Sequence, residues 1–148
     1  MLKVIVHDYR QAVAALDAAA AAGEPVLLMS APGAAAYAGP AWFRDLVAQA
    51  QAAVPDAQAD ALLDCAGRPG DALAAIRAGV PAIAVALPDA VKTRLADMAA
   101  QAGVRIAGYD PAGALDLADH GDPLRACAEW LESRPPGAAG VANPTGVG

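Results

Sequence analysis

Seven polar side chains stand at or just after short apolar runs of the sequence, and their types are those that bind or transform small molecules. Apolar runs of this length, each followed by a helical stretch, are typical of parallel strands, whose carboxyl ends meet at one edge of a sheet. Ligands of α/β proteins bind at that edge, so we expect any ligand site there. The residues concerned are His7, Asp8, Ser30, Asp64, Cys65, Arg68 and Asp110.

Arg68 is the most informative of these residues, because it lies in the glycine-flanked loop CAGRPG just before a predicted helix. A guanidinium group and the free N–H groups at a helix start both attract a carboxylate or a phosphate. The sequence therefore predicts a small anionic ligand in contact with residues 65–70. In the alternative interpretation, Arg68 pairs with Asp64 or Asp71 and only holds the loop. The predicted ligand-binding residues are Asp8, Ser30, Asp64, Cys65 and Arg68.

An enzyme remains an alternative to a binding protein. Asp8 or Asp64 could act as a general base while Arg68 holds an anionic substrate, which is the chemistry of a lyase or isomerase acting on a carbonyl acid. The residues alone assign a catalytic role to no side chain.

Neither a metal nor a cofactor is predicted. His7, Asp8, Asp64 and Cys65 include zinc-ligating types, but they lack the paired Cys or His spacing of a zinc site. The loop SAPGAAAYAG has no P-loop lysine and does not follow a GxGxxG pattern, so it is not a nucleotide fingerprint.

The elements that must position these residues alternate between strand and helix. Strand starts are separated by the spacing of βαβ crossovers, which predicts a single α/β domain with about five parallel strands. A doubly wound, flavodoxin-like sheet is favoured over a half-barrel, since a curved sheet lacking its last strands would expose an apolar face. The predicted strands are 4–6, 25–29, 61–64, 82–87 and 104–107, with a short sixth at 114–117. Predicted helices cover 9–22 and begin at Pro40, near Asp71, at Asp89 and at Pro123.

The order of these phrases resembles the first five βα units of the 2-keto-3-deoxy-6-phosphogluconate aldolase family of (β/α)8 barrels. The similar segments include VIVHD, AAAAGEPVLLMS, AAVPDAQADALLD, ALAAIRAGVPAIAVALP and AAQAGVRIAG, and the resemblance extends over about two thirds of the chain. The resemblance implies a related scaffold. It does not imply aldolase activity, because Leu28 stands where the family has its glutamate and the segment at Asp116 offers no Schiff-base lysine.

Composition limits the partners. The net charge of the 148-residue chain is −6 and its ten Lys and Arg residues are scattered, which argues against nucleic acid. No apolar stretch is long enough to span a membrane, and the absence of a leader at the N-terminus predicts a cytoplasmic protein. Cys65 and Cys127 are expected to be free thiols. The stretch 135–148, rich in Gly and Pro, is predicted to be a disordered tail after a domain of residues 1–134.

Two tryptophans each stand next to another bulky apolar residue. In a helix, neighbours cannot both face the core, so one member of the pair Trp42 and Phe43, and one of Trp130 and Leu131, must leave the buried face. This pattern predicts a homodimer. The leading hypothesis is thus a non-catalytic α/β protein that binds a small anionic metabolite or a protein partner, with the enzyme above and an interaction subunit of a larger assembly as alternatives.

Overall fold

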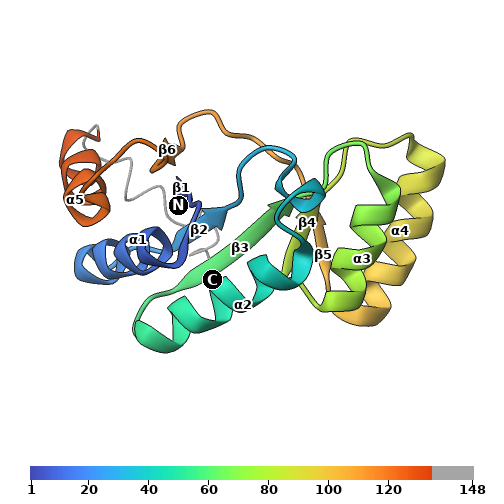
Figure 1. Cartoon of the computed structure of the whole chain (residues 1–148), viewed down its shortest axis with the longest axis horizontal. Coiled ribbons are helices and arrows are strands. Elements are labelled where there is room, and N and C mark those ends of the chain that lie inside the picture. Colours follow the sequence, from blue (N-terminus) through green and yellow to red (C-terminus); the bar gives the residue numbers. More distant parts are fainter. Residues whose placement is uncertain (135–148) are drawn as a thin grey trace, which may run out of the picture.

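The computed structural model describes residues 1–134, and the predicted disordered tail at 135–148 lies outside the described residues. Strands and helices alternate along the described chain, as the sequence predicts (Figure 1). The elements are β1 (Leu2–Ile5), α1 (Tyr9–Ala22), β2 (Val26–Met29), the short 3-10 helix η1 (Ala34–Ala36), α2 (Pro40–Ala53), β3 (Ala59–Asp64), α3 (Pro69–Ala78), β4 (Ala82–Ala84), α4 (Asp89–Ala102), β5 (Arg105–Ala107), β6 (Leu115–Asp116) and α5 (Pro123–Ser133).

All the strands belong to one six-stranded sheet with the order β5-β4-β3-β2-β1-β6. Every neighbouring pair is parallel. The predicted α/β class and the parallel strands with helical crossovers are therefore confirmed, while the preference for a flavodoxin-like sheet over a half-barrel stays a prediction. The predicted sixth strand is β6, which pairs with β1 at the positions Val4↔Leu115 and Ile5↔Asp116.

The fourth strand is shorter than predicted, since β4 ends at Ala84 and not at Leu87. β3 reaches Asp64 opposite Ala84, and β5 ends at Ala107 opposite the same residue. Neither β3 nor β5 continues beyond this point to pair with residues 85–87. The N–H of Ala86 instead donates to the carbonyl oxygen of Ala66, 2.8 Å away, in the loop after β3.

The main core lies between one face of the sheet and the helices. Side chains of alternate strand residues point to opposite faces, and Val4, Leu28 and Leu63 join buried residues of α1 to α5 in one cluster. A smaller cluster, built on Leu62, occupies the other face, where Tyr109 packs against it. In Figure 1 the helices α1 to α4 follow one side of the sheet, and the connection from β5 to β6 crosses the other.

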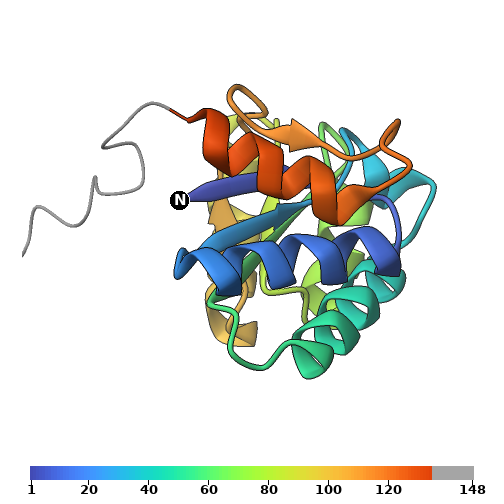
Figure 2. The same ribbon diagram turned by 90° about the vertical axis from the view of Figure 1, so that its left-hand side faces the viewer.

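The last helix, α5, packs against α1 and so holds the C-terminal part of the described chain to the N-terminal part. Asp122 accepts a hydrogen bond from the N–H of Arg125 at 3.1 Å and Pro123 opens α5, as predicted. The helix packs along α1 (Figure 2). None of the helices within residues 1–134 is both long and apolar enough to cross a membrane.

Candidate functional site

Ser30 directly follows β2 and Asp64 ends β3, and both are buried, with 2% and 8% of their surface exposed. The Ser30 hydroxyl donates to the carbonyl oxygen of Ala31 at 3.0 Å and accepts from the N–H of Asp64 at 2.9 Å. One carboxylate oxygen of Asp64 accepts from the N–H of Gly33 at 2.8 Å and the other from the N–H of Ala66 at 3.1 Å. These two predicted site residues therefore connect the loops after β2 and β3.

Cys65 is the next residue and is only 1% exposed. Burial raises the pKa of its thiol to about 12, with the negative charges of Asp64 and Asp71 adding to the effect. Burial raises the pKa of Cys127 to about 11. Both thiols are free, and at neutral pH they stay protonated, the form in which a thiol is a poor nucleophile.

Arg68 precedes α3 and its side chain is 63% exposed. Its Nε donates to a carboxylate oxygen of Asp71 at 2.6 Å. The structure thus contains the arrangement expected in the alternative interpretation, in which Arg68 pairs with Asp71.

Asp110, another of the residues predicted at the carboxyl edge of the sheet, lies on the connection between β5 and β6 and is exposed. Its carbonyl oxygen accepts from Lys3 Nζ at 3.0 Å, and its carboxylate accepts from the N–H of Ala112 at 3.0 Å. Asp110 therefore fastens this connection to β1.

His7, directly after β1, forms a pair that the sequence does not reveal. Its Nε2 lies 2.6 Å from a carboxylate oxygen of Asp116, at the end of β6. Burial alone would raise the pKa of Asp116, but the hydrogen bonds from His7 and from the N–H of Ala118, with the nearby His7 and His120 charges, hold it below its ordinary value. Asp116 is accordingly a carboxylate at neutral pH, and it orients the imidazole.

A buried glutamine supports the same corner of the fold, where β1 and β6 end. Gln11 is 5% exposed; its side-chain oxygen accepts from the N–H of His7 at 2.7 Å, and its Nε2 donates to the carbonyl oxygen of Leu117 at 3.1 Å. Gln11 on α1 thereby connects the end of β1 to the residue after β6.

The largest hollow described at the carboxyl edge lies beside this corner, between the start of α1 and one face of α2. Its volume is about 320 Å³. Positions 42, 45, 46 and 49 share one side of a helix, which explains why α2 supplies most of one wall. The lining residues are His7, Asp8, Tyr9, Trp42, Asp45, Leu46 and Gln49.

A second, smaller hollow adjoins the first and shares His7 and Trp42 with it. Its other lining residues include Tyr37, from the loop after β2. The two hollows together are called the aromatic groove here, because Tyr9, Tyr37 and Trp42 are 46%, 71% and 42% exposed. These three side chains are half of the large hydrophobic side chains exposed in residues 1–134, and no hydrogen bond joins them to one another.

Of the five predicted ligand-binding residues, Asp8 lines the aromatic groove, where it also accepts from the N–H of Gln11 at 2.8 Å and so begins α1. The sequence signal for Trp42 is confirmed in one respect, since Phe43 is 1% exposed and Trp42 is the member of the pair that leaves the core. Tyr9, Tyr37 and Asp45 carry no comparable signal in the sequence.

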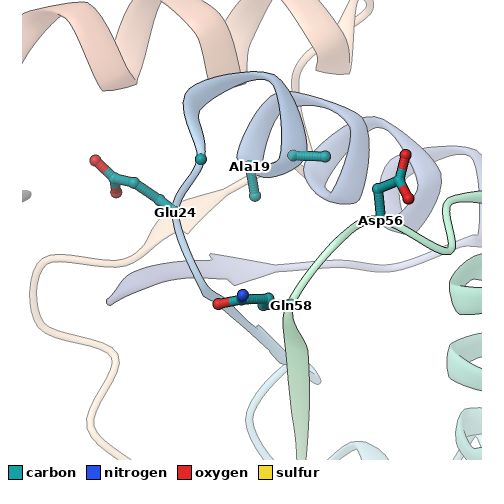
Figure 3. A pocket seen from close by; sticks show the side chains of 6 residues that line it. Ala19, Glu24, Asp56 and Gln58 are labelled. Atoms are coloured by element: carbon teal, nitrogen blue, oxygen red, sulfur yellow. The ribbon is translucent and has the colours of Figure 1, made fainter.

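A third hollow, of about 70 Å³, lies at the opposite end of the sheet, below the C-terminus of α1. Figure 3 shows Glu24 and Asp56 on opposite sides of it, with Ala19 between them. The two carboxylates do not converge on one point, and Glu24 forms an ion pair with Arg134. This hollow therefore has no acid–base pair and lies away from the edge where α/β proteins bind ligands.

Within residues 1–134, no three His, Cys, Asp or Glu side chains are grouped so that they could hold a metal ion. No protein-family model matches the chain. No curated protein matches its sequence either. The case for a function therefore depends on the geometry of the aromatic groove.

Proposed function

We propose that this chain is a non-catalytic binding protein whose small ligand occupies the aromatic groove. The observation that supports the proposal is a hollow of about 320 Å³ at the carboxyl edge of the sheet, lined by aromatic side chains and a few polar groups. Small-molecule sites have volumes of roughly 300 to 1,000 Å³ and this mixture of lining residues. The edge is also where this class of sheet binds its ligands.

A binding role is favoured over catalysis by the state of the predicted reactive groups. Both oxygens of Asp64 already accept backbone hydrogen bonds, and the Cys65 thiol is buried and protonated. The lyase or isomerase stays a second candidate because of one observation, the imidazole of His7, which lines the groove and is oriented by Asp116. The anion site predicted around Arg68 is less favoured, since Asp71 already neutralises that guanidinium.

The proposal is tested by a thermal-shift screen of amines, carboxylates, phosphates and neutral polar compounds, followed by calorimetric titration of the compounds that stabilise the protein. Trp42→Ala should weaken binding of such a compound at least about tenfold, because a largely desolvated aromatic side chain contributes this much to a ligand contact. Leu124→Ala is the matched control, since Leu124 is a comparably exposed apolar side chain (48%) on α5. Equal affinity of the Trp42 and Leu124 variants would contradict the proposal, as would a screen without any stabilising compound.

Homodimer formation is a competing proposal for the same face, since a second copy packed on Trp42 would close the aromatic groove, and Trp42 is the tryptophan that supports it. Trp130 is partly buried against the core, with the guanidinium carbon of Arg134 5.4 Å from its ring centre. The exposed side chains of Trp42 and Tyr37 are more costly to leave in water on a monomer. Light scattering at high micromolar concentration should give the mass of a dimer for the parent chain and of a monomer for Trp42→Ala. A monomeric parent protein would exclude this assembly.

We also propose a cytoplasmic location, supported by two cysteines that are free in the fold.

A further inference from the structure

Two carboxylates stand at the mouth of the aromatic groove. Asp8 uses one oxygen to accept from the N–H of Gln11, and Asp45 uses one to accept from Arg44 Nε at 2.9 Å. The second oxygen of each carboxylate has no hydrogen-bond partner within residues 1–134. Because Asp8 comes from the loop after β1 and Asp45 from α2, the two charges flank the groove from different elements.

Among the positive groups nearby, Arg44 forms an ion pair with Asp45, with 2.9 Å between its Nε and the carboxylate oxygen. Arg44 donates through Nη1 to the carbonyl oxygen of Ala78, which ends α3, and Arg10 donates to the carbonyl oxygen of Gly121. His7 faces the carboxylate of Asp116. None of the side chains that line the described hollows of the groove is a lysine or an arginine.

The N-termini of the neighbouring helices add a weaker, positive contribution to the electrostatic potential at the groove. The N-termini of α1 and α2 both point to this edge, and each carries roughly half a positive charge. Asp8 is itself the cap of α1 and offsets that helix. Gly39 precedes α2 and offers it no side-chain cap, and Asp45 is paired with Arg44. Asp8 is therefore the carboxylate of the groove that has no basic side chain as a partner within residues 1–134, in a chain whose net charge is −6.

The same groove presents the aromatic rings of Tyr9, Trp42 and Tyr37. The face of an aromatic ring attracts a cation, tryptophan most strongly, and groups of aromatic rings are the usual recognition sites of quaternary ammonium ligands. From this combination of exposed rings and the Asp8 carboxylate we infer that the ligand of the aromatic groove is a small organic cation bearing an amine or quaternary ammonium group. This inference rests on the proposed function, because it names the class of ligand for that site.

Choline is a suitable probe, and 3,3-dimethylbutan-1-ol is its neutral isostere of the same shape. Calorimetric titration of the intact chain should show choline binding at least about tenfold more tightly than the alcohol, since only the cation gains from the rings and the carboxylates. Inorganic phosphate and acetate serve as anionic probes. Raising the salt concentration should weaken choline binding, because exposed charges are screened.

Two variants connect the cation to this groove. Trp42→Ala and Asp8→Asn should each lower choline affinity about tenfold or more; asparagine caps a helix as well as aspartate does, so α1 should remain folded in the second variant. Asp97→Asn is the control, since Asp97 is exposed on α4 and far along the chain from the groove.

The outcomes separate the two proposals. Tight binding of the alcohol or of an anion, lost in Trp42→Ala, would overturn the cation and keep the groove as a binding site. Choline binding that neither Trp42→Ala nor Asp8→Asn weakens would overturn the cation inference, because the cation would then bind elsewhere. Binding of no probe and of no compound in the wider screen would remove both proposals.

Discussion

Replacing Asp64 by alanine should lower the free energy of unfolding by about 2 to 3 kcal/mol. The substitution removes two hydrogen bonds from a carboxylate to the N–H groups of Gly33 and Ala66, and leaves both donors in a partly buried place. Each bond to a charged group contributes about 1.5 to 3 kcal/mol, and part of that is returned because the buried charge disappears as well. Urea unfolding followed by circular dichroism measures the change.

Asp97→Ala is the matched control for this prediction. Asp97 is exposed in the middle of α4, so the same substitution should change the stability by less than about 0.5 kcal/mol. Were Asp64 a catalytic base and not a structural group, Asp64→Ala would unfold at the same urea concentration as the control and would lose only activity. Equal midpoints for the two variants would thus exclude the structural role.

Breaking the ion pair between Glu24 and Arg134 should lower the free energy of unfolding by a comparable amount. Their side chains are only 12% and 13% exposed, and the pair joins the end of α5 to the loop between α1 and β2. Glu24→Gln removes the negative charge and leaves the guanidinium poorly solvated, which costs about 3 kcal/mol for a pair this buried. Thermal unfolding and urea unfolding should both show the loss.

A double-mutant cycle shows whether the cost comes from the broken pair. Glu24→Leu combined with Arg134→Leu should recover much of the stability that either change alone removes, because no unpaired charge remains. The exposed pair of Arg125 and Glu129 on α5 is the control, and Glu129→Gln should give little measurable change. Strictly additive single effects would show that Glu24 and Arg134 do not stabilise the protein as a pair.

The sequence predicts the helices accurately where a local group ends them. The helix 9–22 is confirmed residue for residue, because Asp8 caps its start and Gly23, at φ 68°, takes the left-handed conformation that ends it. The ends of strands are predicted less accurately. β1 begins at Leu2 and not at residue 4, and β4 stops at Ala84 and not at residue 87. A strand continues only as far as a neighbouring strand can pair with it, and pairing depends on elements distant in the sequence.

The order of the strands depends on the same distant pairings. Right-handed crossovers allow several orders for the same series of strands and helices, so local pattern alone does not place β6 next to β1. That placement decides part of the candidate site, since Asp116 and Leu117 become the partners of His7 and Gln11 only when β6 pairs with β1.

The polar residues at the strand ends were predictable in position, while their partners were not. Asp64 and Ser30 lie at the ends of their strands as expected, but their hydrogen bonds go to each other and to backbone N–H groups of the adjacent loops. The aromatic groove is formed by side chains from the loop after β1, from α1 and α2, and from the loop after β2. The sequence indicates His7 and Asp8 by their position after a strand and Trp42 by its bulky neighbour, while Tyr9, Tyr37 and Asp45 carry no such signal.

The short strand β6 has a consequence for how the fold assembles and opens. β1 to β5 each lie beside the strand before them, so they can assemble through successive closures of short chain segments. β6 must instead return across more than a hundred residues to reach β1, with two residues in register and the N–H of Leu117 bonded to Ile5. Such a segment forms late in folding and opens first in the native state. Each opening also releases Asp116 from His7, so the orientation of this imidazole lasts only as long as the C-terminal segment stays docked.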